Sequence, residues 1–345
     1  MALEVSVVIP ARDEAGAIGA CLAALARQSI GPAALDVIVV AAGTDDTEGV
    51  ARRASSEMGF GRFVAVRIER GNKNAALRAG CAVATAPVVV MLDADTDLAD
   101  DAVEELARAV REGPERAVHG APVPRYQSWI SRYWELNRLL HKELRFDGML
   151  SGEFVAMRRA TIERLGGDAL FPELPNLKAD FHLARTLASL GVATGYVPSA
   201  RGTTFVPWTF RGLTRTMLRS RRGTLSIASR ADAWAQAAMS AMLVGGLPAA
   251  LLVMHRSRML AFVCMAPLLA YTMRLWQGVE ALRRQGCGDH RRELAPFLVL
   301  DLTGRAIKLW TFVERVTGRT PPLAFRGERP GEAGASGAPT RGASS

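Results

Sequence analysis

Short, continuous apolar runs alternate with helix-like segments through the first 92 residues, and this alternation restricts the fold more than any other feature of the chain. The predicted strands cover residues 5–9, 37–40, 63–68 and the run that ends at Leu92. The predicted helices between them cover residues 17–28, 47–58 and 75–84. Apolar strands that alternate with helices are typical of parallel sheets covered by helices on both faces. The sequence therefore predicts an α/β fold.

Charged side chains follow the predicted strands at the points where the strands end. These residues are Asp13, Asp45, Lys73, Asp93 and Asp95. In open sheets of this kind, ligands bind beyond the carboxyl ends of the parallel strands. We therefore expect these side chains to lie along one edge of the sheet and to form a polar site.

Asp93 and Asp95 stand one residue apart at the end of the fourth apolar run. Carboxylate oxygens are hard ligands that suit Mg²⁺ or Mn²⁺, and such ions usually take further ligands from water and from a substrate's phosphates. The pair therefore predicts a divalent-metal site for a diphosphate-bearing substrate. The alternative is an ordinary strand-end turn with solvated acids.

The composition points to an anionic partner. Lys and Arg outnumber Asp and Glu by 43 to 34, which suits nucleic acid, phospholipid headgroups or a phosphorylated substrate. The sequence has no nucleic-acid recognition motif, so we expect no nucleic-acid partner. The four cysteines are far apart and lack metal-ligand spacing, which predicts free thiols in a reducing compartment.

Five short segments within residues 1–225 form a recognisable series of motifs. They are Val7-Val8-Ile9-Pro10-Ala11-Arg12-Asp13-Glu14, Gly71-Asn72-Lys73-Asn74-Ala75-Ala76-Leu77, Asp93-Ala94-Asp95, Ser151-Gly152-Glu153-Phe154-Val155-Ala156-Met157-Arg158-Arg159 and Lys178-Ala179-Asp180. In order and spacing the series resembles the family 2 glycosyltransferases, which are inverting enzymes that use nucleotide sugars. The resemblance implies the GT-A fold, a Rossmann-like mixed sheet flanked by helices, and a metal-dependent transferase.

The resemblance also implies roles for individual residues. Inverting transfer is a direct displacement at the anomeric carbon, in which one carboxylate takes the acceptor's proton and a metal ion neutralises the leaving diphosphate. Asp180 is the expected base, with Glu153 as the second candidate, and Asp93 and Asp95 are the expected metal ligands. The expected donor-binding residues are Pro10, Arg12, Glu14, Asp45, Lys73, Asp93 and Arg219, and the expected acceptor-side residues are Gly152 and Glu153.

Three positions depart from the family's pattern. Ala41-Ala42 replaces the acidic pair that usually follows the second strand, so the resemblance does not define the nucleoside site. The segment 216–220 keeps only Arg219 of the Q-x-x-R-W motif of processive enzymes, which predicts transfer of one sugar per encounter. Ala179 replaces the acid that usually precedes the catalytic residue, although Asp180 itself is present.

The composition changes after residue 210, where a basic stretch precedes three apolar runs. Residues 233–254 carry no charge over 22 positions, enough to cross a bilayer, which takes about 20. The run 259–273 is shorter and predicts a partner in a hairpin, and the charge-interrupted run 293–313 predicts an interfacial helix. The basic loop 255–258 argues against a simple hairpin and leaves a re-entrant arrangement open. Buried core helices of a soluble protein are the further alternative.

These features predict a catalytic domain over residues 1–225, membrane-associated helices over 226–318 and a disordered tail over 319–345. The N-terminus shows no signal-peptide pattern, and arginines precede the first span, so we expect a cytoplasmic (inner) membrane protein whose catalytic domain faces the cytoplasm. The expected partners are a nucleotide-sugar donor, first of all a UDP-sugar, and a lipid-linked or amphipathic acceptor in cell-envelope polysaccharide or glycolipid synthesis.

Two other functions fit parts of the sequence. A sugar-phosphate nucleotidyltransferase also uses an α/β sheet, but such enzymes usually have a Gly-rich loop after the first strand, and here no glycine occurs before Gly16. A catalytically degenerate scaffold that binds nucleotide or lipid would explain Ala41-Ala42 and Ala179, but not the presence of Asp93, Asp95 and Asp180 together.

Overall fold

The chain divides into two compact units. The computed structural model describes residues 2–69, 72–173 and 179–319. Of these, residues 2–125, 146–173 and 179–205 form a sheet unit, and residues 126–145 and 206–319 form a helical unit. The predicted tail lies, from residue 320 onward, outside the described residues.

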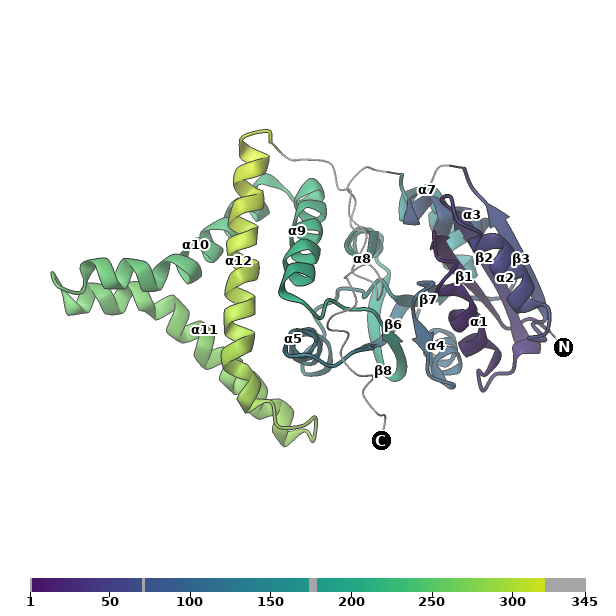
Figure 1. Ribbon diagram of the computed structural model, residues 1–345, viewed down its shortest axis with the longest axis horizontal. Helices are drawn as coiled ribbons and strands as arrows, with labels where there is room; N and C mark the ends of the chain where they lie inside the picture. Colours follow the sequence, from purple (N-terminus) through teal and green to yellow (C-terminus); the bar gives the residue numbers. More distant parts are fainter. Residues whose placement is uncertain (1, 70–71, 174–178, 320–345) are drawn as a thin grey trace. The chain divides into compact units, whose positions relative to one another are not determined.

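The sheet unit is built on one eight-stranded sheet (Figure 1). Its strands are β1 (Val5–Arg12), β2 (Leu35–Ala42), β3 (Arg62–Arg67), β4 (Val88–Leu92), β5 (Asp97–Leu98), β6 (Arg116–Pro124), β7 (Phe154–Arg158) and β8 (Ala193–Thr204). They lie in the order β3-β2-β1-β4-β7-β6-β8-β5. The first four strands are parallel, whereas β7 is antiparallel to both β4 and β6. The predicted α/β fold with a mixed sheet is therefore confirmed.

Helices cover both faces of this sheet. They are α1 (Ile18–Ala26), η1 (Pro32–Ala34), α2 (Thr47–Ser55), α3 (Lys73–Val83), α4 (Ala102–Arg111), α6 (Arg159–Leu165), α7 (Gly167–Leu170) and α8 (Ala179–Ser189). Side chains alternate along β1, so that Val7 and Ile9 pack in the core with α1 and α4, and Val8 packs in the core with α3 and α8. Both faces of the central strands are consequently buried.

Helix α3 lies unusually close to β1. A Cβ atom on Gly80 would stand 2.3 Å from Cγ1 of Val8, a distance that real side chains do not reach. Glycine is therefore required for this approach. The packing holds α3 against the sheet, and with it Lys73, the first residue of the helix.

A buried carboxylate connects the first strands of the sheet. Asp36 on β2 is fully buried and accepts hydrogen bonds from the Ser6 hydroxyl at 2.7 Å and from the Thr85 backbone N–H at 3.0 Å. The Arg62 guanidinium on β3 donates to the same carboxylate at 2.9 Å. Because a buried charge is tolerated only when it is paired and hydrogen-bonded, this network fixes β1, β2, β3 and the turn before β4 to one another.

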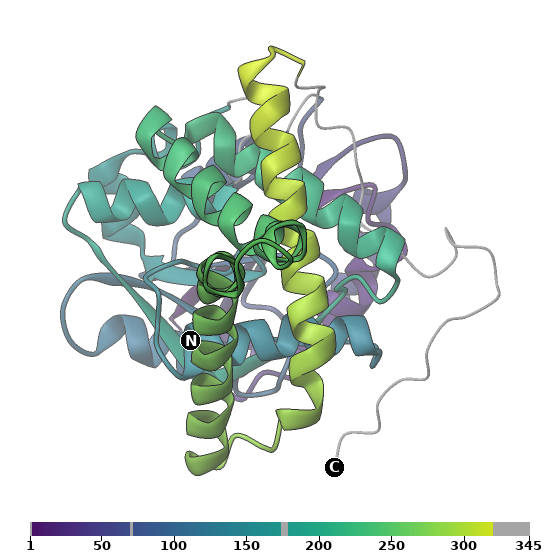
Figure 2. The ribbon, with the colours of Figure 1, turned by 90° about the vertical axis from the view of Figure 1, so that its left-hand side faces the viewer.

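The helical unit packs around its own apolar core. Its elements are α5 (Trp129–Arg138), the short π-helix η2 (Leu139–Glu143), α9 (Phe210–Ile227), α10 (Arg230–Val253), α11 (Arg258–Arg284), η3 (Arg291–Glu293) and α12 (Leu294–Val316). Tyr133, Met217, Val279 and Leu300 bring α5, α9, α11 and α12 together in this core. Figures 1 and 2 show α12, in yellow, running beside α9 and crossing α10.

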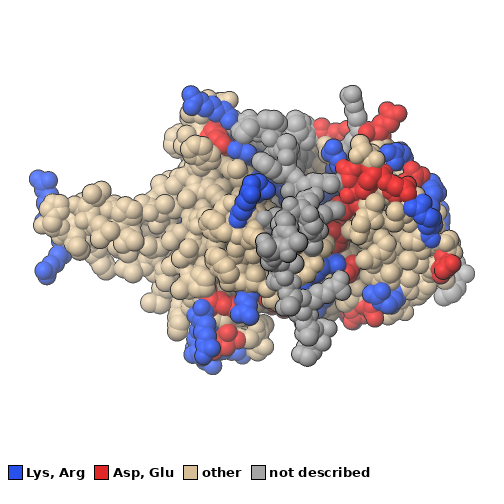
Figure 3. Space-filling model, in the orientation of Figure 1, with Lys and Arg blue, Asp and Glu red and all other residues tan. Residues whose placement is uncertain are grey.

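Two helices of the helical unit, α10 and α11, are long and apolar enough to cross a membrane. They pack against each other near the tip of the pair (Figure 1). In Figure 3 the visible face of that part carries basic atoms at the tip and no acidic ones. The second predicted run, 259–273, is only part of α11, which continues to Arg284. The predicted interfacial segment 293–313 corresponds to α12, whose Phe297, Leu300 and Gly304 are buried.

The Asp36 network predicts a large effect of one substitution on stability. Asp36→Ala leaves the buried Ser6 and Thr85 donors and the Arg62 charge without their acceptor, which should cost roughly 3 kcal/mol. For a domain of this size, that loss lowers the midpoint of thermal unfolding by roughly 6–12 °C. Thermal unfolding of the detergent-purified protein measures it, with Asp36→Asn as the control that keeps an acceptor oxygen. An unchanged midpoint in Asp36→Ala would contradict the prediction.

Candidate active site

Four elements of the sheet unit meet where β4 ends. Asp93 directly follows β4, and its backbone N–H donates to the carbonyl of Glu153 at 2.8 Å. Glu153 directly precedes β7, which pairs antiparallel with β4. Lys73 begins α3, and Asp180 lies in the first turn of α8. The antiparallel pairing of β4 with β7 thus brings Asp93 into contact with Glu153, which lies 60 positions later in the chain.

The Lys73 ammonium connects two of these elements. Its Nζ atom donates to the carbonyl of Gly152 at 2.7 Å and forms an ion pair with the carboxylate of Asp93. The helix start that carries Lys73 is fixed by Asn72, whose side chain accepts a hydrogen bond from the N–H of Ala75. The lysine is therefore held in place by both its backbone and its head group.

Three carboxyl groups, those of Asp93, Glu153 and Asp180, act on this lysine. Burial raises the pKa of Asp93 to about 6; Lys73 opposes that rise, and Asp95 and Asp180 add to it. Burial likewise raises the pKa of Glu153 to about 7, with further repulsion from Asp93. Burial alone would lower the pKa of Lys73, but Asp93 and then Glu153 and Asp180 raise it overall. The site therefore holds more negative than positive charge, which suits a cationic ligand.

Asp180 lies close to residue 152, just before β7, because that residue is a glycine and has no side chain in the way. A Cβ atom on Gly152 would lie 3.2 Å from Cβ of Asp180, closer than ordinary van der Waals contact. One carboxylate oxygen of Asp180 accepts a hydrogen bond from the N–H of Phe181 at 2.9 Å. The neighbouring Glu153 has a buried carboxylate oxygen, Oε2, with no hydrogen-bond partner among the described residues. Both candidate bases are thus placed beside Asp93.

Arg125 supports the loop that carries Asp95. Its guanidinium donates to the carbonyl of Asp95 at 3.3 Å and to the carboxylate of Asp97 at 2.7 Å, and it stacks over the ring of Phe205. The N–H of Thr96 also donates to the carbonyl of Asp93 at 3.1 Å. The Asp93-Ala94-Asp95 segment is therefore a braced turn. The sequence offered no signal for the role of Arg125, since the residue is remote from every motif.

A second braced region joins the loops after β1 and β2. The carboxylate of Asp13 accepts hydrogen bonds from the N–H groups of Thr44 at 2.6 Å and Asp45 at 3.3 Å. Asp13 has a φ of 52°, the one positive value at a non-glycine residue in the part of the chain that the structure describes. A Cβ on Gly43 would stand 2.2 Å from its carboxylate. Asp13 was not among the predicted donor-binding residues, although its place after the first strand was a signal.

The predicted donor-binding residues therefore fall into separate groups. Asp45 uses its carboxylate within the loop, accepting from the N–H groups of Ala15 at 2.9 Å and Thr47 at 3.1 Å. Pro10 and Arg12 belong to the end of β1, and Glu14 donates its N–H to the Thr47 hydroxyl at 2.7 Å. Arg219 lies on α9 in the helical unit.

The predicted metal ligands Asp93 and Asp95 lie at the same strand end. Within residues 2–69, 72–173 and 179–319, no group of three or more His, Cys, Asp or Glu side chains is arranged to hold a metal ion. Two carboxylates still fit an ion that takes most of its ligands from water and a diphosphate. Burial is the main cause of the raised pKa of Asp93, and the repulsion that Asp95 and Asp180 add to it is consistent with that fit.

Comparison with known proteins gave consistent matches. Residues 6–166 match the family model "Glycosyl transferase family 2", and residues 88–277, more than half of the chain, match "Glycosyl transferase family group 2". An N-acetylglucosaminyltransferase of Rhizobium meliloti (strain 1021) is 28% identical over 236 residues, 64% of this chain and 55% of that protein. An N-acetylglucosaminyltransferase of Rhizobium leguminosarum bv. viciae is 27% identical over 235 residues, again 64% of this chain and 55% of that protein. The chain thus spans about half the length of these relatives.

A solved structure shares the fold. The mannosyltransferase PcManGT from Pyrobaculum calidifontis, in complex with GDP-Man and Mn²⁺, matches with a TM-score of 0.56 and 20% sequence identity. The match covers 93% of this chain and 89% of that chain. This likeness supports the GT-A architecture that the sequence motifs implied.

The Asp13 brace predicts a local change in hydrogen exchange. Asp13→Ala removes the charged acceptor of two loop amides, and hydrogen bonds to charged groups contribute about 1.5–3 kcal/mol. The amides of Thr44 and Asp45 should therefore exchange at least about tenfold faster. Hydrogen-exchange mass spectrometry of a peptide over 41–47 measures this, with Asp13→Asn as the variant that retains an acceptor. Unchanged exchange in Asp13→Ala would show that the brace does not hold the loop.

Proposed function

Because the chain belongs to glycosyltransferase family 2, we propose that it moves a single sugar from a nucleotide-diphosphate sugar to a lipid-linked acceptor, with inversion at the anomeric carbon. The reaction forms a bond between the acceptor oxygen and the anomeric carbon, and it breaks the bond between that carbon and the diphosphate. A UDP-sugar is the donor we favour. The names of the Rhizobium relatives make N-acetylglucosamine the first sugar to test.

The meeting of Lys73, Asp93 and Asp180 at one strand end is the observation that carries this proposal. Asp180 is the proposed base that takes the proton from the acceptor hydroxyl, because it stands beside Gly152 at the edge of the site. We propose that Lys73 neutralises a phosphate of the donor, because its ion pair with Asp93 holds the ammonium at the strand end. Arg219, Arg12 and Glu14 remain proposed donor contacts.

A divalent cation, Mg²⁺ or Mn²⁺, is proposed to bind at Asp93 and Asp95. When bound, it would neutralise the charge that grows on the leaving diphosphate. The Mn²⁺ in the PcManGT structure supports trying that ion first. The braced turn over residues 93–97 would keep the two carboxylates in place before any ligand arrives.

Membrane attachment through α10 and α11 is proposed to bring the site to a lipid-linked acceptor. Both helices have the length and apolar composition to enter a bilayer. An enzyme held at the cytoplasmic face of the inner membrane would meet its acceptor by diffusion in two dimensions. The sheet unit would then face the cytoplasm with its soluble donor.

The deciding experiment measures nucleoside diphosphate release. The detergent-purified protein is incubated with Mg²⁺ or Mn²⁺ and a panel of UDP-, GDP- and dTDP-sugars, with and without lipid extract. We expect release from one donor that lipid extract stimulates. Intact nucleotide binding without release from any donor would instead favour a scaffold, and pyrophosphate release from a nucleoside triphosphate and a sugar phosphate would favour a nucleotidyltransferase.

The identity of the base yields a paired prediction. Asp180→Asn should lower kcat by about 10²–10⁴, the usual contribution of a positioned acid or base, while donor affinity stays within a few-fold. Glu153→Gln removes the neighbouring carboxylate without changing its shape and should lower kcat much less. The measurement is kcat with the identified donor, together with donor binding by calorimetry. The reverse order of losses would assign the base to Glu153.

The raised pKa of Asp93 predicts a dependence on pH. Burial raises this pKa to about 6. The Asp93 carboxyl is therefore ionised at pH 7.5 and becomes neutral as the pH falls through about 6. Since only the ionised form binds a cation, kcat/KM for the donor should fall on the acid side with a midpoint near pH 6. Higher Mn²⁺ concentration should move this midpoint to lower pH, because the cation competes with the proton. A midpoint that does not respond to Mn²⁺ would argue against Asp93 as a metal ligand.

A further inference from the structure

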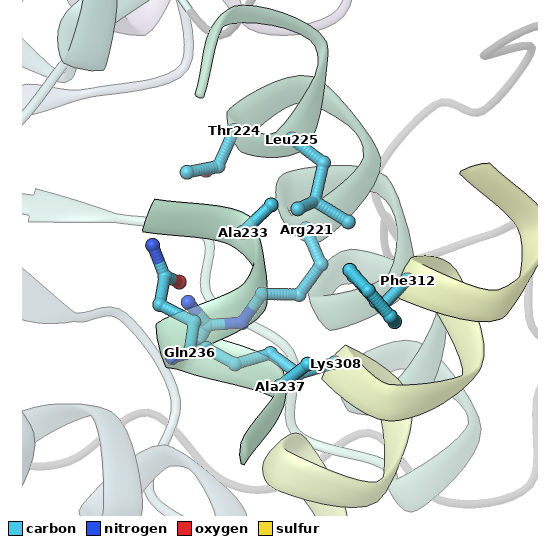
Figure 4. Close-up of a pocket in the computed structure, with 8 residues that line it drawn as sticks. All are labelled: Arg221, Thr224, Leu225, Ala233, Gln236, Ala237, Lys308 and Phe312. Carbon is cyan, nitrogen blue, oxygen red and sulfur yellow. The ribbon is translucent and has the colours of Figure 1, made fainter. Parts of the chain in front are cut away.

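A small pocket lies within the helical unit, between α9, α10 and α12 (Figure 4). It is lined by Arg221, Thr224, Leu225, Ala233, Gln236, Ala237, Lys308 and Phe312. This lining contains two cations, two polar side chains and no carboxylate. The pocket is too small for a nucleotide, and its charge selects for a compact anion.

The two cations of the pocket lack partners that their neighbours have. Arg222, next to Arg221 in the chain, forms a buried ion pair with Glu314 at 2.6 Å. Arg305, one turn from Lys308, pairs with Asp301 at 2.8 Å. By contrast, the side chains of Arg221 and Lys308 make no hydrogen bond or ion pair with any described residue, and Figure 4 shows them close together beside Gln236.

The surroundings of the two cations favour an added anion. Burial lowers the pKa of Lys308 to about 8, and repulsion from Arg221 and Arg305 lowers it further, against a smaller opposing effect of Asp301. Asp301 is already engaged, since it also accepts a hydrogen bond from the Tyr271 hydroxyl at 2.7 Å. Burial also lowers the pKa of Arg221, opposed by Tyr133 of α5 and by Asp301, whereas Arg305 lowers it further. One anion between the two cations would relieve their repulsion.

The position of the pocket on the unit indicates where such an anion comes from. Ala233 and Ala237 belong to the first turns of α10, a candidate membrane helix. Trp234 is 62% exposed, and its ring packs edge-on against Phe312 of the pocket at 4.7 Å. Trp310 is also exposed, on α12. An exposed tryptophan at the end of an apolar helix, as Trp234 is, is typical of the membrane–water interface, the level of lipid headgroups.

We propose that the pocket formed by Arg221, Gln236 and Lys308 binds the phosphate of an anionic phospholipid headgroup. Arg221 and Lys308 supply the charge, and the side-chain amide of Gln236 supplies a further donor. The bound lipid would tie α9 and α12 to α10 where the apolar hairpin begins. The inference rests on the membrane attachment proposed above and is independent of the transfer reaction.

Lipid binding by the full-length protein tests the inference. The detergent-purified protein is titrated with phosphatidylglycerol, phosphatidylcholine or inorganic phosphate, and binding is followed by native mass spectrometry and by the midpoint of thermal unfolding. Phosphatidylglycerol should bind and raise the midpoint, and phosphatidylcholine should do so at least tenfold more weakly. Inorganic phosphate that matches the effect of phosphatidylglycerol would overturn the lipid as the source of the anion.

Substitutions of the two pocket cations test where phosphatidylglycerol binds. Lys308→Gln and Arg221→Gln should each weaken phosphatidylglycerol binding at least tenfold, whereas Lys308→Arg should retain it. Arg284→Gln, which removes an equal charge from the exposed end of α11, is the matched control and should bind as the wild type does. Wild-type binding should weaken above pH 8, as Lys308 loses its proton, and Lys308→Arg should not show this change. Unchanged binding in both glutamine variants would overturn the proposal.

Nucleoside diphosphate release separates this inference from the proposed function. If the transfer reaction fails but phosphatidylglycerol binds through Arg221 and Lys308, only the function is wrong. If transfer is observed but the glutamine variants bind lipid as the wild type does, only the lipid site is wrong.

Discussion

The accumulation of carboxylates around one lysine is the constraint on which the arrangement of the candidate site depends. Asp93, Glu153 and Asp180 come from the end of β4, the start of β7 and the start of α8, and each lies within the electrostatic reach of Lys73. A single ammonium cannot neutralise all of them. Arg125 braces the turn that carries Asp95, and Gly152 leaves room for the side chain of Asp180, so the fold holds like charges together and the site is poised to bind cations.

The sequence predicted the parallel half of the sheet well, because its signal is local. Strands β1 to β4 are short apolar runs that alternate with helices, and both features are visible within a few residues of sequence. Their order in the sheet, β3-β2-β1-β4, was not predicted. The antiparallel pairing of β7 with β4 has no such local signature, since it joins residues 88–92 to residues 154–158. The motif resemblance, rather than periodicity, marked Gly152 and Glu153 as acceptor-side residues.

The candidate site was predicted unevenly for the same reason. Lys73, Asp93 and Asp180 stand in motifs, and the structure brings them together. Asp13 and Arg125 act on backbone groups of loops that are distant in sequence, and no spacing rule reveals such contacts. In the helical unit, the charges on α12 were expected at a membrane surface, but Asp301 and Arg305 pair with each other and Glu314 pairs with Arg222. Charge identity can be read from sequence, whereas charge partners cannot.

The chain order of the sheet has a consequence for synthesis. Strands β1 to β4 are complete by residue 92 and need no later segment to pair with one another, so they can assemble as the chain leaves the ribosome. Glu153 and Asp180 join Asp93 only after some 60 to 90 further residues have been made. The crowded carboxylates consequently come together after the parallel half of the sheet has been made. Nascent folding thus proceeds without the electrostatic repulsion that the finished site contains.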